Sequence, residues 1–239
     1  VDLLPQTNQL RALHTIIPGA PMTALAQDRF VTGLPSDNQL PQVFAATLAR
    51  GEDPRDYVGP PWRSSDRPPL QAGWVLLLAR FPAWLRSGYD TAAQSAGIWF
   101  QLLWIPAAWT WLRSVGASLR AATAIIAGIA VSGFFFFQSV YVWPKLGGAA
   151  FMLLAFVMWF VPPPNASPRA RAIGGAIGAT LAWLSHGGVA LSIIALVPWF
   201  WLRRRTLPPL RAWIAAGFFA GALALPWLAY QKFYDPPGN

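Results

Sequence analysis

The sequence contains no cysteine and few acidic residues, and both absences narrow what the protein can do. Without cysteine there are no disulfides, thiolate metal sites or cysteine nucleophiles, so any chemistry must use oxygen and nitrogen groups. Only nine of the 239 residues are Asp or Glu, and none of them lies between Asp90 and Asp235. Proton-driven pumps and ion channels usually carry ionisable groups within their spans, so this gap argues against ion transport.

Hydrophobic residues, by contrast, make up 55% of the chain, and 14 residues are Trp. This balance differs from that of an ordinary water-soluble domain and indicates that a lipid bilayer is the solvent. The formal charge of +9 raises the alternative of nucleic-acid binding. However, most of the eighteen Lys and Arg residues flank apolar runs instead of forming one basic patch. This placement argues against a nucleic-acid partner and favours contact with membrane lipids.

Long apolar runs begin at Gln94, after a mixed segment rich in Pro and Gly. A helix needs about 20 apolar residues to cross a bilayer. We therefore expect an all-α, polytopic transmembrane bundle, with residues 1–93 as an external loop segment, 94–230 as the transmembrane region and 231–239 as an external tail. The expected spans are 94–112, 121–140, 146–161, 172–184, 189–202 and 212–230. The fourth and fifth are short, and form either two short or tilted helices joined by His186-Gly187-Gly188 or one long helix broken there.

Arginines alternate between successive connections of this bundle. Every second connection carries them, namely Arg113, Arg120, Arg169, Arg171, Arg203, Arg204, Arg205 and Arg211. Of the two intervening connections, one holds Lys145 and the other holds only His186. Because short connections rich in Lys and Arg stay in the cytoplasm, the segments before Gln94 and after Tyr230 are predicted to be external.

Two short helices are expected within the external segment. Apolar residues recur at helical spacing between Asn38 and Gly51, with Pro41 in the first turn and the glycine at the stop. A second helix is expected from Leu70 to about Phe81. It is too apolar for water and too short to span a bilayer. We therefore expect both helices to lie at the membrane interface.

An acidic motif stands immediately before each of these helices. The two motifs read Pro35-Ser36-Asp37-Asn38 and Ser64-Ser65-Asp66-Arg67-Pro68-Pro69-Leu70. This arrangement resembles the membrane glycosyltransferases that use lipid-linked donors, the GT-C superfamily that includes protein O-mannosyltransferases and the aminoarabinose transferase of lipid A. The resemblance covers roughly residues 30–112 by motif and the remainder only by hydropathy. The family's first transmembrane helix and later spans are absent, and we expect the chain to be a membrane glycosyltransferase of this type or the N-terminal portion of one.

The resemblance implies transfer of a sugar from a polyprenyl-phosphate donor to an acceptor on the external side of a bacterial inner or plasma membrane. A carboxylate that takes the proton of the acceptor hydroxyl is the expected base, which makes Asp37 the first catalytic candidate and Asp66 the second. The leaving lipid phosphate is negative, so cations are expected around it. The candidates for binding this phosphate are Arg67, Lys145, Arg63 and His186.

Each of these residues also has a structural interpretation. Asp37 and Asp66 stand where a helix N-cap is expected, and such a cap contributes about 1 kcal/mol without any catalytic role. A lone histidine in a tight turn, such as His186, is more often structural or solvated. The other histidine, His14, has no carboxylate partner at metal-ligand spacing. Carboxylates of the external segment can still hold a hard divalent cation, so the cofactor stays undetermined.

The alternative function is a non-enzymatic membrane subunit that packs against partner membrane proteins. An enzyme must gather Asp37, Asp66 and a cation around one outward-facing cavity, whereas a docking segment can leave them scattered in solvent. A lipid or sugar flippase is disfavoured because no charge lies within the spans. The glycosyltransferase interpretation therefore predicts that Asp37, Asp66 and a cation lie around one outward-facing cavity.

Overall fold

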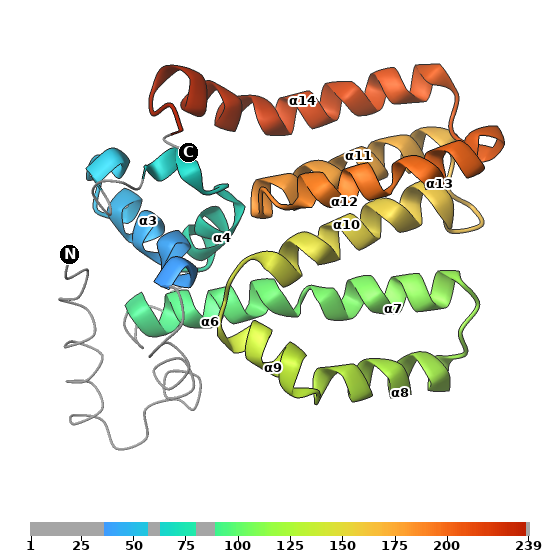
Figure 1. Ribbon diagram of the computed structural model, residues 1–239, viewed down its shortest axis with the longest axis horizontal. Coiled ribbons are helices and arrows are strands. Elements are labelled where there is room, and N and C mark those ends of the chain that lie inside the picture. Colours follow the sequence, from blue (N-terminus) through green and yellow to red (C-terminus); the bar gives the residue numbers. More distant parts are fainter. Residues whose placement is uncertain (1–35, 57–62, 80–88, 238–239) are drawn as a thin grey trace.

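The computed structural model describes residues 36–56, 63–79 and 89–237. All regular elements within these ranges are helices, which confirms the predicted all-α fold (Figure 1). In chain order they are η1 (Ser36–Gln39), α3 (Leu40–Ala49), η2 (Pro54–Asp56), η3 (Ser64–Asp66), α4 (Leu70–Ala79), α6 (Tyr89–Leu102), α7 (Trp104–Ser114), α8 (Leu119–Ala130), α9 (Gly133–Val140), α10 (Lys145–Phe160), α11 (Pro168–Ser185), α12 (Val189–Ala195), α13 (Val197–Leu202), η4 (Arg204–Thr206) and α14 (Leu210–Phe233).

The apolar runs predicted as spans are all helical, but three of them are divided. The first is interrupted at Leu103, and the fifth at Leu196. The second consists of α8 and α9, which are bent by 67° relative to each other. Residues 186–188 separate α11 from α12, so the fourth and fifth runs are distinct helices. Among the described helices, α14 alone is long and apolar enough to cross a bilayer by itself, and α8 with α9 would add a second span if counted together.

Serines set the starting points of three helices. The side chains of Ser118, Ser132 and Ser167 each accept a hydrogen bond from the backbone N–H three residues later, at the starts of α8, α9 and α11. Such N-caps satisfy one of the backbone donors that a helix start leaves without a partner. The Ser132 cap begins a new helix within the second apolar run, which accounts locally for the bend there.

The two predicted short helices are present as α3 and α4. Their apolar side chains form one cluster with α6, made of Phe44, Ala45, Ala72, Val75, Ala93 and Ala96. The residue before α3 is Gln39, and α4 begins at Leu70. Neither Asp37 nor Asp66 is therefore the N-cap of the helix that follows it, and the capping interpretation is wrong for both. Together α3, α4 and the start of α6 form a small helical layer at one end of the bundle (Figure 1).

The centre of the bundle is the contact of α11 with α10 and α14. A Cβ at Gly178 would lie 3.0 Å from the carbonyl oxygen of Phe151, so α10 and α11 approach closely there. On the other side, α11 meets α14 through a cluster of Ala172, Ala212 and Ala216. Small residues let helix backbones pack closely, which is how helices associate when no water drives them together.

Side-chain amides hold the irregular backbone between α9 and α10. Those of Asn38, Gln71 and Gln94 donate hydrogen bonds of 2.7 to 2.9 Å to the carbonyls of residues 140–142. The Gln101 carbonyl oxygen accepts from the first two backbone N–H groups beyond Lys145, at 3.2 and 3.3 Å. A buried backbone group without a partner is costly, so these amides make the break tolerable. They also tie η1, α4 and α6 to the segment between α9 and α10.

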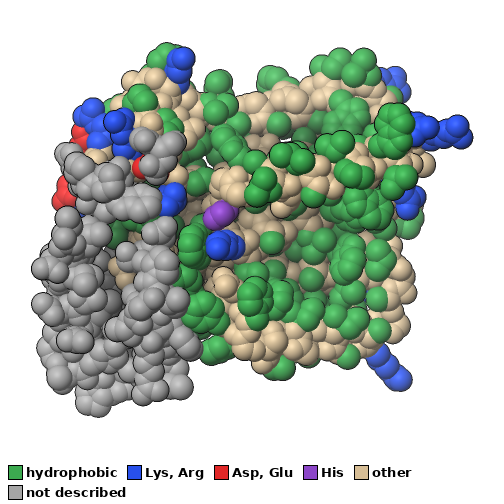
Figure 2. Space-filling model, viewed as in Figure 1, with side chains coloured by type: hydrophobic (Ala, Val, Ile, Leu, Met, Phe, Trp, Pro, Cys, Tyr) green, Lys and Arg blue, Asp and Glu red, His purple; other side chains and the backbone are tan. Residues whose placement is uncertain are grey.

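Charged residues gather at the two ends of the molecule. The connections α7–α8, α10–α11 and α13–α14, which carry the alternating arginines, lie together at one end (Figure 1). Figure 2 shows acidic side chains at the opposite end, beside α3, and a broad hydrophobic surface in between. The arginines that alternate between connections in the sequence therefore lie at one end of the molecule, apart from the acidic side chains at the other end.

Candidate functional site

The second acidic motif is folded as a tight turn. Asp66 is the last residue of η3, and its carboxylate accepts a 2.8 Å hydrogen bond from the backbone N–H of Arg63. This bond closes the turn and presents Arg67 next in the chain, in an extended conformation. The carboxylate of Asp66 therefore shapes the loop that carries the arginine.

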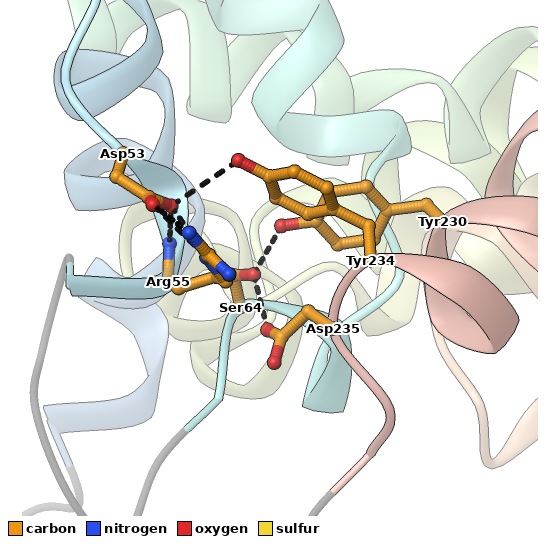
Figure 3. A network of polar contacts seen from close by, with 6 residues as sticks. All are labelled: Asp53, Arg55, Ser64, Tyr230, Tyr234 and Asp235. Carbon is orange, nitrogen blue, oxygen red and sulfur yellow. Dashed lines mark hydrogen bonds and ion pairs between the residues drawn. The ribbon is translucent and has the colours of Figure 1, made fainter.

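The C-terminal end of α14 holds this turn from the other side (Figure 3). Ser64 donates a 2.6 Å hydrogen bond to the carboxylate of Asp235 and makes a second one with the hydroxyl of Tyr230. The backbone N–H of Ser65 also donates to Asp235, and its carbonyl accepts from the amide of Gln231 at 3.0 Å. Ser64, Ser65 and Asp235 are all buried, so the loop and the helix end form one packed unit.

A second set of polar contacts lies on the outer side of this unit. The guanidinium of Arg55 pairs with Asp53, and its hydrogen bonds lower the pKa of that carboxyl to about 2. Tyr234 donates to Asp53 at 3.4 Å, and the Arg55 guanidinium lies 4.8 Å from the centre of the tyrosine ring. Arg63 donates a 2.7 Å hydrogen bond to the backbone carbonyl of Pro236. Arg63 thus contacts the C-terminal segment, and it does not line the cavity described next.

A cavity of about 300 Å³ opens beside the turn. It is lined by the motif loop, by the turns before α10 and after α11, and by the end of α14. The lining residues are Pro41, Ser65, Asp66, Arg67, Pro68, Trp143, Pro144, Trp183, Ser185, His186, Gly187, Gly188, Trp227 and Gln231. Of the residues predicted from sequence, the structure therefore brings Asp66, Arg67 and His186 to one cavity.

His186 is held in a defined orientation at the cavity wall. Its Nδ1 accepts a 3.0 Å hydrogen bond from the backbone N–H of Gly188, so the neutral ring carries its proton on Nε2. A Cβ at Gly188 would lie 2.9 Å from the ring, which explains why this position is a glycine. Burial lowers the pKa of His186 below its usual value, and the positive charges of Lys145 and Arg67 lower it further. At neutral pH the ring is therefore an uncharged hydrogen-bond donor.

Lys145 lies next to the cavity without lining it. Its ammonium group is 4.0 Å from the centre of the Trp143 ring, and this ring also neighbours Tyr141 at 5.9 Å and His186 at 6.5 Å between ring centres. The Lys145 side chain is exposed. Lys145 and Arg67 are the two positive charges that act on His186, and the cavity wall also carries the carboxylate of Asp66.

Asp37 lies in η1, and its side chain is outside the described residues. Its neighbour Asn38 is buried and bonds to the carbonyl of Tyr141, and Pro41 lines the cavity. The backbone of Asp37 is therefore at the same end of the bundle as Asp66. This end is opposite to the one that carries Arg203 (Figure 1).

Several lining residues were not predicted from the sequence. Trp143, Trp183 and Trp227 come from three separate segments and were noted only as part of the high Trp content. Ser65 belongs to the second acidic motif but was not singled out in it, and Gln231 lies outside both motifs. The described residues contain no group of three His, Asp or Glu side chains placed to hold a metal ion.

Comparisons with known proteins found no matching family model, no similar curated protein and no similar solved structure.

Proposed function

We propose that this chain is a membrane glycosyltransferase, or the N-terminal portion of one, that moves a sugar from a polyprenyl phosphate to an acceptor at the external face. The observation that carries the proposal is the cavity that joins Asp66, Arg67 and His186 at the end opposite the arginine-rich connections. A pocket with a few converging polar groups and a perturbed histidine is the usual form of a binding site.

A bilayer position is supported by the distribution of apolar surface. Large hydrophobic side chains are exposed between the charged ends, for example Phe218 at 73% and Leu191 at 72%. Soluble monomers rarely expose apolar patches of this extent. The helices α10 and α11 have 16 and 18 residues, or about 24 and 27 Å, close to the ~30 Å of a hydrocarbon core. We therefore propose a polytopic bundle whose cavity lies at the external headgroup level.

The proposed reaction uses a carboxylate as base and cations at the leaving group. The acceptor hydroxyl gives its proton to Asp37 as its oxygen bonds to the anomeric carbon of the sugar. The bond between that carbon and the phosphate oxygen breaks, and the electron pair leaves with the polyprenyl phosphate. Arg67 and the Nε2–H of neutral His186 are suited to hydrogen-bond this phosphate, with the charge of Lys145 nearby. Asp66 supports the reaction by shaping the turn that presents Arg67.

Donor consumption by the purified full-length protein tests the proposal. The protein is incubated with radiolabelled polyprenyl-phosphate hexoses and a membrane extract as the acceptor source. Transfer by the native protein is expected to fall about 10²- to 10⁴-fold in Asp37→Asn, which removes the base. Asp53→Asn is the matched control, because this carboxylate is paired with Arg55 away from the cavity and its loss should leave the rate unchanged.

Two results contradict the proposal at different levels. Full activity of Asp37→Asn removes the base assignment but leaves sugar transfer standing. A native protein that neither transfers nor hydrolyses any donor contradicts the enzyme itself and favours a membrane subunit that docks partner proteins.

A further inference from the structure

Ser65 carries a buried hydroxyl that the protein does not use. The residue is 1% exposed, and its Oγ has no hydrogen-bond partner among the described residues. Buried polar groups in native proteins are nearly always paired, so an orphaned hydroxyl needs a reason. Ser65 lies on the wall of the cavity, which offers one.

The backbone of Ser65 is fixed on both sides. Its N–H donates to Asp235, and its carbonyl accepts from Gln231. The neighbouring hydroxyl, that of Ser64, is saturated by Asp235 and Tyr230. Only the Ser65 hydroxyl is left over, on a residue whose position is already set by α14. The backbone that carries this hydroxyl is therefore fixed before a ligand arrives.

Besides the carboxylate of Asp66, the cavity wall has a cationic group and an uncharged group of residues. The positive charges of Arg67 and Lys145 both act on His186. The backbone carbonyl of Ser65 is instead hydrogen-bonded to the amide of Gln231. A phosphate suits the first group. A hydroxyl and an amide suit a saccharide ring, which presents hydroxyls at its edge.

We propose that Ser65 is a sugar-binding residue, whose hydroxyl pairs with a hydroxyl of the donor saccharide while Gln231 contacts the same ring. This inference rests on the proposed function and adds to it where the sugar lies. The volume of about 300 Å³ corresponds to roughly ten waters at ~30 Å³ each, enough for one monosaccharide. The end of α14 thereby contributes to the specificity for the donor sugar.

Binding of two matched probes tests this assignment. The full-length protein in lipid nanodiscs is titrated with a ten-carbon prenyl-phosphate hexose and with the same prenyl phosphate lacking the sugar, and Kd is followed by tryptophan fluorescence. Ser65→Ala is expected to weaken the sugar-bearing probe about three- to tenfold, the value of one hydrogen bond, and to leave the sugar-free probe unchanged. Because the hydroxyl has no protein partner to lose, Ser65→Ala should keep the native Tm.

Ser139→Ala is the matched control. Ser139 is also buried, but it is not among the lining residues of the cavity and its hydroxyl already donates to the carbonyl of Phe135 at 2.8 Å. Its replacement should not alter either Kd. A Ser65→Ala variant that keeps the native Kd for the sugar-bearing probe, or loses affinity equally for both probes, overturns the sugar contact while the proposed function stands. A native protein that binds neither probe overturns both.

Discussion

Ser64 donates a hydrogen bond to Asp235, 171 residues further along the chain. The bond joins the second acidic motif to the segment that follows α14, and both residues are buried. The orientation of Arg67 in the cavity therefore depends on a carboxylate that no local motif connects to it.

Removing the Asp235 carboxylate should destabilise the fold. Asp235→Ala leaves the Ser65 N–H without its acceptor and Ser64 with only Tyr230, so the free energy of unfolding should fall by about 1–3 kcal/mol. Thermal unfolding in detergent measures the change as a lower Tm. Tyr234→Phe is the control, because its 3.4 Å hydrogen bond is exposed and its loss should stay within about 0.5 kcal/mol. Equal effects of the two variants would mean that the buried contact is not stabilising.

His186 should make stability depend on pH. Its pKa is lowered in the folded state, so the unfolded chain binds the proton more readily. Stability is then complete above about pH 6.5 and falls as the pH drops from there toward the lowered pKa. In His186→Asn, which keeps an acceptor for the Gly188 N–H, this part of the pH dependence should disappear. Tm measured from pH 8 to pH 5 checks it, and identical curves for the two proteins would contradict the assignment.

The crossing of α10 and α11 should not tolerate a methyl group at Gly178. The added Cβ meets backbone atoms of Phe151 and Ala155 at 3.0 and 3.1 Å, which cannot move aside as a flexible side chain can. Gly178→Ala should therefore lower the free energy of unfolding by about 1–3 kcal/mol. Gly128→Ala on α8 meets nothing within 4 Å and should be neutral or stabilising by up to about 1 kcal/mol. A Gly178→Ala variant as stable as Gly128→Ala would show that the helices can separate at little cost.

The two charged ends should be accessible from opposite sides of the membrane. Because the chain has no cysteine, a single introduced thiol reports its own position without background. Glu52→Cys, at the end with the cavity, should react with a membrane-impermeant maleimide in intact cells. Asn165→Cys, in the α10–α11 connection, should react only after permeabilisation. Labelling of both from the outside would exclude the proposed topology.

The helices were predictable because their signals are local. The apolar spacing and Pro41 marked α3, and the apolar runs marked α6 to α14 to within a few residues. The breaks at Ser132 and Leu196 were missed, since an apolar run has the same composition whether it is straight or bent. Of the site residues predicted from the sequence, Asp66, Arg67 and His186 line one cavity, and their roles there stay predictions. Arg63 is not among the lining residues, and its partner is the distant backbone of Pro236.

The helical, apolar character of the chain and the charges at alternate connections were predictable, because they depend on the composition and spacing of neighbouring residues. The packing of the helices was needed to show that Trp143, Trp183 and Trp227 share a cavity with the acidic motif, and that Asp235 holds this motif in place. Those contacts join segments far apart in the chain, and they depend on how three helices pack through their small residues. No pattern within one segment carries that information.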